Sequence, residues 1–269
     1  MNSTTGAAEI ARAVGNGDTT ARAVVIAALA RIEANNGRVN AFTDVTSARA
    51  MARAEAVDAE VRAGKALPLA GVPFAVKNLF DLKGVTTRAG SRINRDNAPA
   101  FADAVLVGRL EAAGAVCVGA LNMDEYASGF TGENAHDGAV HNPHGLDHMT
   151  GGSSAGPAAA VAAGMVPLSL GSDTNGSIRV PASLCGVFGL KPTFGRLSRS
   201  GTFPFVADFD HVGPLARSVE DLALSYDVLQ GFDGDDPALD LGEAQFPLAD
   251  QGSEHLFHPG AHPFRNGAG

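Results

Sequence analysis

The sequence has few cysteines and few aromatic residues. It contains no Trp, two Cys in 269 residues and only 6% aromatic residues. Cys117 and Cys185 each lie in an apolar stretch, which indicates two buried thiols in a reducing compartment rather than a disulfide framework. A fold that depends on disulfide bonds is therefore excluded.

Positive charge and long apolar runs are also scarce. Lys and Arg total 20 against 29 Asp and Glu, a formal net charge of −9, and such a surface repels a phosphate backbone. No stretch approaches the roughly 18 apolar residues of a membrane-spanning helix, and the N-terminal residues lack the pattern of a signal peptide. We expect a cytoplasmic protein with neither a nucleic-acid nor a membrane partner.

Glycine (33 residues) and apolar residues (45%) are plentiful, enough for a buried core with close backbone approaches. Apolar periodicity predicts alternating helices and strands, which favours an α/β fold. Asp18 or Thr19 is the expected N-cap of the second helix. The predicted elements are two helices within 7–35, helices over 46–63 and 104–114, and strands over 66–78 and 115–121.

The segment 145–190 concentrates Gly and Ser between short apolar runs. After about residue 232 no periodicity persists, and we expect a disordered tail over 232–269. Before the tail, a helix over 218–231 has Ser218 and Asp221 at the spacing of a capping box and Gly231 at its end. Within the Gly- and Ser-rich segment we predict a loop at 151–154, a helix over 155–164, a strand over 166–171, a tight turn over 173–176 and a helix that opens at Ser177.

One short string fits a known nucleophile motif. Residues 152–156, GSSAG, match the G-x-S-x-G turn of α/β-hydrolases, with Ser154 as nucleophile. That turn follows a hydrophobic strand, whereas the preceding HNPHGLDHMT is polar and rich in turn formers. Ser154 is therefore a weak candidate.

Ser177 and Lys77 are stronger candidates. Ser177 follows a strand and a turn, so the backbone N–H groups of 174–177 would converge on one point, although a helix cap is the alternative role for this serine. Lys77 ends an apolar strand, where desolvation lowers the pKa of an amine and lets it act as a base toward a serine. The alternative for Lys77 is a solvated surface lysine.

These residues, together with Ser153, stand in strings that follow one another in a fixed order: GVPFAVKNLFD, LNMDEYASGFTGEN, GGSSAGPAAAVAAG, and GSDTNGSIRVPAS followed by GVFGLKPTFGRLSRSG. In these strings the chain resembles the amidase signature family, over roughly residues 8–231. The resemblance implies a mixed β-sheet core covered by helices on both faces. It divides the chain into an amidase signature domain over 1–231, with a helical start at 7–63 and a catalytic core at 66–231, and an atypical remainder over 232–269.

The resemblance also implies a chemistry. Ser177 would be the nucleophile, Ser153 a bridging serine on a cis peptide bond, and Lys77 the base, with neither a metal nor an organic cofactor. An acyl-enzyme would form with release of ammonia and then be hydrolysed. The resemblance places Thr174, Asn175, Gly176 and Ser177 at the oxyanion, and Tyr126, Ser128 and Gly129 beside the substrate.

Three positions depart from the family pattern, which has Gly at Ala155 and Asn175 and Ser at Pro157. Asn175 lies in the oxyanion loop, where Asn tolerates left-handed backbone. The Asp-Thr-Asn-Gly-Ser string is similar to that of amidases of s-triazine breakdown. A small, anionic, urea-like amide such as 1-carboxybiuret is therefore the leading substrate, and a glutamine amidotransferase subunit or a broad aliphatic amidase is the alternative.

A histidine-rich segment offers a competing metal hypothesis. His141, His144 and His148 have a spacing compatible with zinc, and His136, Asp137 and Asp147 lie nearby. The segment carries turn signals and no Cys, so we predict a polar loop. The histidines at 255, 258 and 262 are weaker still as ligands.

Chains of the family normally continue well beyond this length. We therefore expect a truncated or frame-shifted amidase that lacks the C-terminal part of the fold. The alternative, from a different class, is a catalytically dead fragment that acts as an interaction module. The expected partners are a small amide substrate, a second copy in a homodimer and, as in some relatives, a small accessory subunit.

Overall fold

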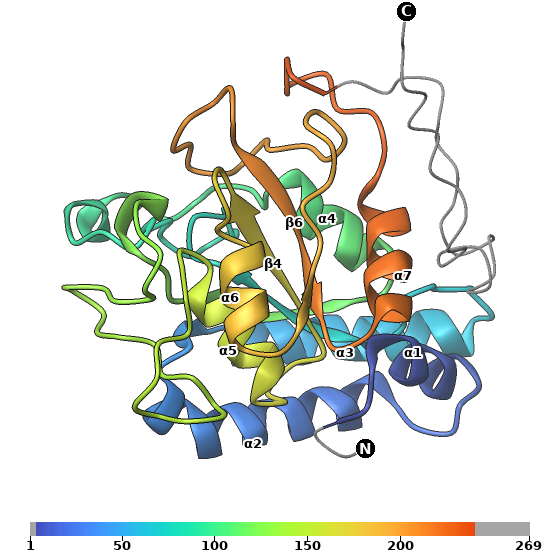
Figure 1. Cartoon of the computed structure of the whole chain (residues 1–269). Coiled ribbons are helices and arrows are strands. Elements are labelled where there is room, and N and C mark those ends of the chain that lie inside the picture. Colours follow the sequence, from blue (N-terminus) through green and yellow to red (C-terminus); the bar gives the residue numbers. More distant parts are fainter. Residues whose placement is uncertain (1–3, 240–269) are drawn as a thin grey trace, which may run out of the picture.

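The computed structural model describes residues 4–239, which form a mixed α/β fold around one β-sheet (Figure 1). The strands are β1 (Phe42–Val45), β2 (Pro73–Lys77), β3 (Val116–Leu121), β4 (Leu168–Asp173), β5 (Phe188–Gly189) and β6 (His211–Ala216). They pair in the order β1-β3-β2-β4-β6-β5. The order of the strands in the sheet differs from their order in the chain, since β2 lies between β3 and β4, which both follow it in the sequence.

The three central strands are parallel and buried. β2 pairs in parallel with β3 on one side and with β4 on the other, while β1, β6 and β5 are antiparallel to their neighbours. Every residue of β2, β3 and β4 is buried, as expected for parallel strands covered on both faces. The carboxyl ends of β2 and β4 therefore meet at one edge of the sheet.

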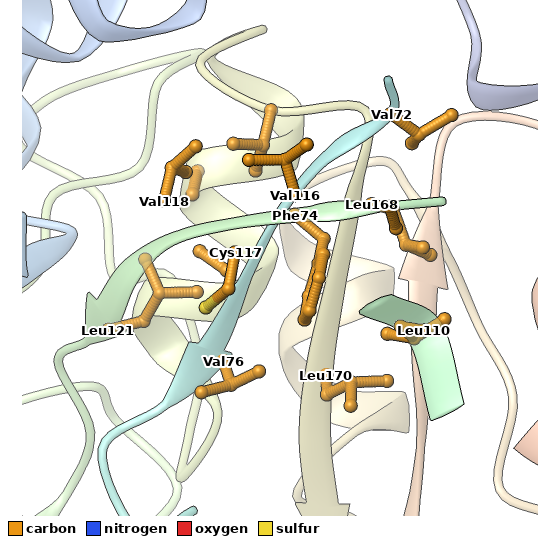
Figure 2. Close-up of a cluster of buried hydrophobic side chains, with 14 of the residues drawn as sticks. Val72, Phe74, Val76, Leu110, Val116, Cys117, Val118, Leu121, Leu168 and Leu170 are labelled. Carbon is orange, nitrogen blue, oxygen red and sulfur yellow. The ribbon is translucent and has the colours of Figure 1, made fainter. Parts of the chain in front are cut away.

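Figure 2 shows the apolar cluster that holds these strands together, with Phe74 of β2 between side chains of β3 and β4. Phe74, Leu168 and Val116 are fully buried, and each such side chain contributes about 1.5–3 kcal/mol by its burial. The short side chains of helix α5 (Ala155–Ala162) allow it to pack closely on the central strands. This packing gives the polar residues at the strand ends a rigid support.

Helices cover both faces of the sheet, as predicted, with α5 and α6 on one face and α4 and α7 on the other (Figure 1). The helices of the described part are α1 (Ala7–Gly15), α2 (Ala21–Val39), α3 (Ser47–Arg62), α4 (Val105–Ala112), α5 (Ala155–Ala162), α6 (Arg179–Leu184) and α7 (Val219–Leu229), with two 3-10 turns, η1 (Ile93–Asp96) and η2 (Glu125–Ala127). None of them, within residues 4–239, has the length and apolar character to cross a membrane.

The N-caps of two helices were predicted from the sequence, and the structure confirms one of them. The predicted cap of α7 is present, because the Ser218 side chain accepts a hydrogen bond from the Asp221 N–H. The predicted N-cap of α2 is wrong: Thr20, not Asp18 or Thr19, accepts from the Ala23 N–H. Asp18 and Thr19 instead donate their backbone N–H groups to Ala13 and so complete the turn that ends α1.

Three predicted boundaries around the site also need correction. The strand predicted over 66–78 begins only at Pro73, because the residues before it form turns. The strand predicted over 166–171 begins and ends two residues later, at Leu168–Asp173, so Asp173 ends β4 instead of opening a turn. The helix predicted to open at Ser177 begins at Arg179.

The start of the predicted tail, residues 232–239, is held against the domain. Arg199 pairs with both carboxylate oxygens of Asp236, at 2.9 and 3.1 Å, and Ser198 donates a hydrogen bond to Asp233. The rest of the predicted disordered tail, 240–269, lies outside the described residues, as do the three histidines at 255, 258 and 262.

Candidate active site

The parallel pairing of β2 and β4 brings Lys77 to a cluster of serines. Lys77 is the last residue of β2 and is fully buried. Its Nζ donates to Ser153 Oγ at 2.7 Å and to Ser172 Oγ at 2.9 Å. Two of the three predicted catalytic residues are thus in direct contact, and Ser172 of β4 is a partner that the sequence analysis did not single out.

The loop that carries Ser153 is fixed from both sides. The peptide bond between Gly152 and Ser153 is cis, and Ser153 is fully buried. The neighbouring Ser154 Oγ donates to the Ser172 carbonyl at 3.0 Å and accepts from the Ser172 N–H at 3.2 Å. The hydroxyl of Ser154 therefore fastens this loop to β4, a structural role in place of the nucleophile role that the G-x-S-x-G string suggested.

Burial alters the charge state of Lys77. Removal from water disfavours the ammonium form and lowers the pKa of Lys77 to about 7, although the carboxylates of Asp124, Asp173 and Asp210 act in the opposite direction. An amine with a pKa near neutrality is present in both forms at pH 7, as a general base requires. The alternative of a solvated surface lysine is excluded by the geometry.

Ser177 lies next to this cluster and is 4% exposed. Its carbonyl accepts a hydrogen bond from the Ser154 N–H at 3.1 Å, which joins the two serine loops. The N-cap of α6 is Ile178, and no side chain caps this helix, so the alternative role of Ser177 as a helix cap does not hold. Within residues 4–239 the Ser177 hydroxyl makes no hydrogen bond, including none to Ser153.

The loop that precedes Ser177 is organised by a residue that sequence reasoning missed, Asp173. Its carboxylate accepts from the backbone N–H groups of Gly176 at 2.7 Å and Ile178 at 3.1 Å, and pairs with Arg179 at 2.9 Å. Burial alone would raise the pKa of Asp173, but these bonds outweigh it and lower the pKa to about 2. The sequence does contain a signal for this role. Asp173 stands three residues before Gly176, a common pattern for an Asp side chain that accepts hydrogen bonds from the backbone N–H groups of its own turn.

This arrangement corrects one predicted oxyanion donor. The Gly176 N–H is engaged by Asp173, so it is not directed at a substrate oxygen. The N–H groups of Thr174, Asn175 and Ser177 have no acceptor in the described part of the chain. Asn175 is exposed and does not adopt positive φ, whereas Gly176 does, at φ +127°.

The predicted substrate residues Tyr126, Ser128 and Gly129 are not among the residues that line a neighbouring cavity of about 270 Å³; Ala127, which lies between them in the sequence, does line it. Tyr126 adopts φ +52° and packs against Phe203, with ring centroids 5.4 Å apart. Ser128 is exposed and Gly129 is half-buried. The cavity borders the lysine site through Ser172, and its walls include Leu79, Ala127, Ser172, Arg199, Phe203 and His211.

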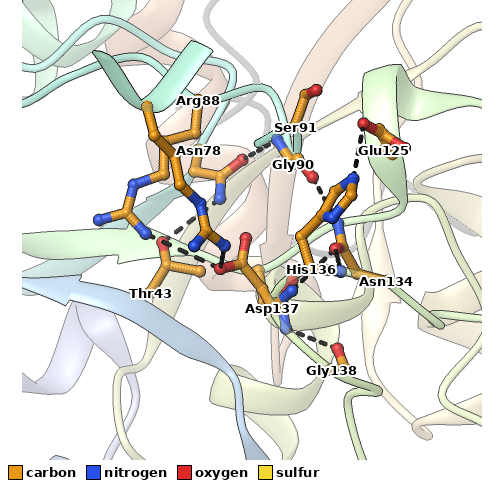
Figure 3. A network of polar contacts seen from close by, with 12 residues as sticks. Thr43, Asn78, Arg88, Gly90, Ser91, Glu125, Asn134, His136, Asp137 and Gly138 are labelled. Carbon is orange, nitrogen blue, oxygen red and sulfur yellow. Dashed lines mark hydrogen bonds and ion pairs between the residues drawn. The ribbon is translucent and has the colours of Figure 1, made fainter. Parts of the chain in front are cut away.

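Polar loops around the site are cross-linked by a network shown in Figure 3. Asn78, which follows Lys77, accepts from the Gly90 N–H at 2.9 Å. The Asn134 side chain donates to the carbonyls of Gly90 and Met123, both at 2.8 Å. These bonds tie the loops after β2 and β3 together and so fix the surroundings of Lys77.

The histidine-rich segment has separate partners for its rings. His136 lies 3.1 Å from Glu125, and the ring nitrogens of His141 and His144 lie 2.9 and 3.0 Å from the carbonyls of Leu146 and Cys185. Among residues 4–239 no three potential ligands converge on a metal position. These residues behave as a polar loop.

Comparison with known proteins decides the family. Residues 23–255 match the family model described as Amidase. The chain belongs to the amidase signature family. It is 61% identical over 247 residues to the AtzE subunit of 1-carboxybiuret hydrolase from Pseudomonas sp. (strain ADP), and 52% identical over 228 residues to the A subunit of glutamyl-tRNA(Gln) amidotransferase from Anaeromyxobacter dehalogenans (strain 2CP-C). These matches cover 91% and 84% of this chain but 54% and 45% of the relatives.

Solved amidase signature structures have the same fold. A chain from a vestigial protein complex related to an s-triazine catabolic enzyme superposes with a TM-score of 0.89 at 60% identity, covering 91% of this chain and 54% of that one. Peptide amidase from Stenotrophomonas maltophilia superposes with a TM-score of 0.86 at 35% identity, covering 92% and 52%. The chain thus spans about half the length of the amidase signature proteins that it matches.

Proposed function

We propose that this chain carries the catalytic serines and lysine of an amidohydrolase that cleaves a C–N bond of a small carboxamide or urea-like substrate and releases ammonia. The observation that carries the proposal is the 2.7 Å contact between a fully buried Lys77 and Ser153. A buried lysine that bonds two hydroxyls and no carboxylate has no evident structural purpose, because an unpaired buried charge is destabilising. Membership of the amidase signature family supports the same interpretation.

In the proposed reaction, neutral Lys77 takes a proton from Ser153 Oγ while Ser153 takes one from Ser177 Oγ. The Ser177 oxygen then attacks the carbonyl carbon. The Ser177 hydroxyl has to turn toward Ser153 for this step, and catalytic hydrogen bonds commonly tighten only when substrate is bound. No metal ion or organic cofactor takes part.

The oxyanion of the tetrahedral intermediate would be bound by the free N–H groups of Thr174, Asn175 and Ser177. Each donor of this kind contributes about 3 kcal/mol to the stability of the transition state. The proton returns from Lys77 through Ser153 to the leaving nitrogen, which departs as ammonia when the C–N bond breaks. Water then hydrolyses the Ser177 ester by the reverse proton path.

The leading substrate is a 1-carboxybiuret-type amide, as in s-triazine degradation. The likeness to the AtzE subunit of 1-carboxybiuret hydrolase supports it, because that identity, 61%, exceeds the 52% to the amidotransferase relative. Arg199 in the cavity wall is not a free binding group for an anionic substrate, because it is already paired with Asp236 at 2.9 Å. An amidotransferase-like use of a glutamine amide is the second candidate, supported by the several glutamyl-tRNA(Gln) amidotransferases among the relatives.

The location and the partners of the chain are part of the same proposal. The two cysteines are buried and unpaired, which supports a reducing, cytoplasmic location. We propose a homodimer with a small accessory subunit; the accessory subunit is supported by the similar chain with a TM-score of 0.89, which was solved in a protein complex. Size-exclusion chromatography with light scattering, on the chain alone and with candidate small subunits, tests both.

The function is tested by covalent labelling. The intact mass is measured after treatment with a small sulfonyl fluoride, for the wild type, Ser177→Ala and the control Ser154→Ala. A single adduct that disappears only in Ser177→Ala supports an activated Ser177. A folded wild-type protein without an adduct contradicts the proposal, and the alternative of a catalytically dead interaction module then takes its place.

A further inference from the structure

Asp124 is an ionisable residue that the proposed reaction does not use, and it lies against the loop that carries Ser153. Asp124 follows β3 and is 2% exposed. Neither of its carboxylate oxygens has a hydrogen-bond partner among the described residues. Such a group is costly to bury, so its retention in this position calls for a functional explanation.

The surrounding backbone leaves just enough space for this carboxylate. A Cβ atom on Gly152 would lie 2.4 and 2.5 Å from the Asp124 oxygens, and a Cβ on Gly129 would lie 2.2 Å from Oδ2. The Asp124 N–H also donates to the Ser153 carbonyl at 3.3 Å. The carboxylate therefore rests on the residue next to Ser153, whose hydroxyl contacts Lys77.

Three carboxylates act on Lys77, each from a different element: Asp124 from the loop after β3, Asp173 from β4 and Asp210 from the turn before β6. Asp173 is neutralised by Arg179 and backbone N–H groups. Asp210 accepts from the Thr174 hydroxyl and from two backbone N–H groups, those of Phe205 and Val206. Asp124 differs from both, because within residues 4–239 it has no ion-pair partner and no hydrogen bond of ordinary geometry, and besides Lys77 only nearby backbone amides, among them those of Gly132 and Thr131, favour its charge.

We propose that Asp124 is a positioning residue of the active site, and that its buried carboxylate is the counter-charge for the Lys77 ammonium. This role rests on the proposed function in one respect, since Lys77 has to hold a proton between its arrival from Ser153 and its delivery to the leaving nitrogen. Without a counter-charge, an ammonium in a fully buried site has only two hydroxyls to replace its water. Asp124 thereby acts on the reaction through Lys77 and does not touch the substrate.

The electrostatics of the two groups agree with this role. Burial raises the pKa of Asp124, while Lys77 and the nearby amides of Gly132 and Thr131 act to lower it. Asp124 in turn raises the pKa of Lys77 against the effect of burial. Each charge therefore makes the other less unfavourable.

The test measures the titration of Lys77 directly. The sequence has four lysines, at 65, 77, 83 and 191, so protein labelled with [ε-¹³C]lysine gives four resonances, and Lys77→Met assigns the one of interest. In the wild type this resonance should titrate near pH 7. In Asp124→Asn and Asp124→Ser the midpoint should fall by about 1 to 3 pH units, the usual effect of removing one nearby opposite charge.

Glu125→Gln is the matched control. It removes the adjacent carboxylate, which pairs with His136 at 3.1 Å, and should leave the Lys77 midpoint unchanged. An unchanged midpoint in the folded Asp124 variants overturns the proposal. Should those variants not fold, the carboxyl ¹³C resonance of Asp124 in Lys77→Met decides: it should titrate at higher pH than in the wild type, and an equal midpoint overturns the proposal.

This experiment is separable from the test of the proposed function. A wild-type Lys77 that titrates at its ordinary value, near pH 10.5, contradicts the proposed base, whereas the role of Asp124 is still decided by whether the midpoint falls in the Asp124 variants. A Lys77 that titrates near 7 and does not respond to Asp124 contradicts only the role of Asp124. The labelling of Ser177 by the sulfonyl fluoride is measured separately and does not depend on either titration result.

Discussion

Lys77 Nζ donates to Ser172 Oγ at 2.9 Å, so the lysine is bound by β4 as well as by the Ser153 loop. Ser172 also uses its backbone N–H and carbonyl to bind the hydroxyl of Ser154. One residue of β4 therefore contacts both the Lys77 amine and the loop that carries Ser153. The contact between Lys77 and Ser153 is thus supported by β4 on both sides, at the amine and at the loop.

Ser172→Ala should weaken this arrangement. The buried amine loses one of its two hydroxyl partners, which should lower the free energy of unfolding by about 1 to 2 kcal/mol and slow labelling of Ser177 about tenfold. Ser169→Ala is the control, because Ser169 lies on the same strand and donates to the Pro157 carbonyl, away from Lys77. Urea unfolding and labelling rates measure both effects, and equal labelling in the two variants would contradict the role of Ser172.

Labelling of Ser177 should depend on pH through Lys77. Because burial lowers the pKa of Lys77 to about 7, the neutral base is scarce at pH 5 and predominant at pH 9. The labelling rate should rise through pH 7 and then level off. A rate that keeps rising to pH 10 would mean that another group is the base. Labelling is measured at unit pH intervals on the wild type.

Stability should follow the same ionisation. The folded-state pKa of Lys77 is below its usual 10.5, so between about pH 7 and 10.5 the unfolded chain binds more protons than the folded one. The free energy of unfolding therefore increases with pH in this window, relative to a Lys77→Met protein. Parallel urea unfolding curves of the two proteins at pH 7 and 9 measure the difference, and identical pH dependence would show that Lys77 is not desolvated.

The residues with proposed chemical roles could be identified where they lie in strings of distinctive composition. Lys77, Ser153 and Ser177 each stand in such a string, and the structure brings the first two into contact. Ser172 and Asp124 were not predictable, because their contacts depend on strand register and on the path of a loop between distant segments. In the sequence alone, a buried aspartate after a strand resembles any loop aspartate.

The fold was likewise predictable only in part from the sequence. Periodicity identified the long helices and the two apolar strands β2 and β3, whose burial is complete. It did not predict β6, since Gly213 and Pro214 inside that strand weaken its local strand signal. β6 forms because its neighbour β4 offers a complete antiparallel register from Leu168 to Asp173, which is tertiary information.

Asp173→Asn should disrupt the loop over 174–177, which we propose binds the oxyanion. The pKa of Asp173 is lowered to about 2, below its unfolded value of about 3.8, so its charge contributes stability that is present above pH 4 and lost as the pH falls toward 2. The substitution should lower the free energy of unfolding at pH 7 by about 2 kcal/mol and abolish labelling of Ser177. Urea unfolding at pH 7 and intact mass after labelling measure the two effects.

The matched control for that variant is Asp221→Asn. Asp221 is also buried and accepts a backbone N–H, that of Ala8, at 2.8 Å, but lies at the start of α7. Its substitution should cost stability without affecting labelling. Loss of labelling in both variants would show that the loss reflects general destabilisation rather than the geometry of the Ser177 loop.

Gly176→Ala should separate loop geometry from side-chain chemistry. Gly176 adopts φ +127°, a conformation that is strained for any residue with a Cβ, and the added Cβ would lie 3.1 Å from Val180 Cγ2. We expect a loss of about 1 to 3 kcal/mol of stability and loss of labelling, because the loop cannot keep the N–H groups of Asn175 and Ser177 in place. Asn175→Gly, at an exposed position without positive φ, should keep labelling within about twofold and lose at most about 1 kcal/mol. If Asn175→Gly instead abolishes labelling, the Asn175 side chain takes part in the chemistry and the backbone alone does not form the oxyanion site.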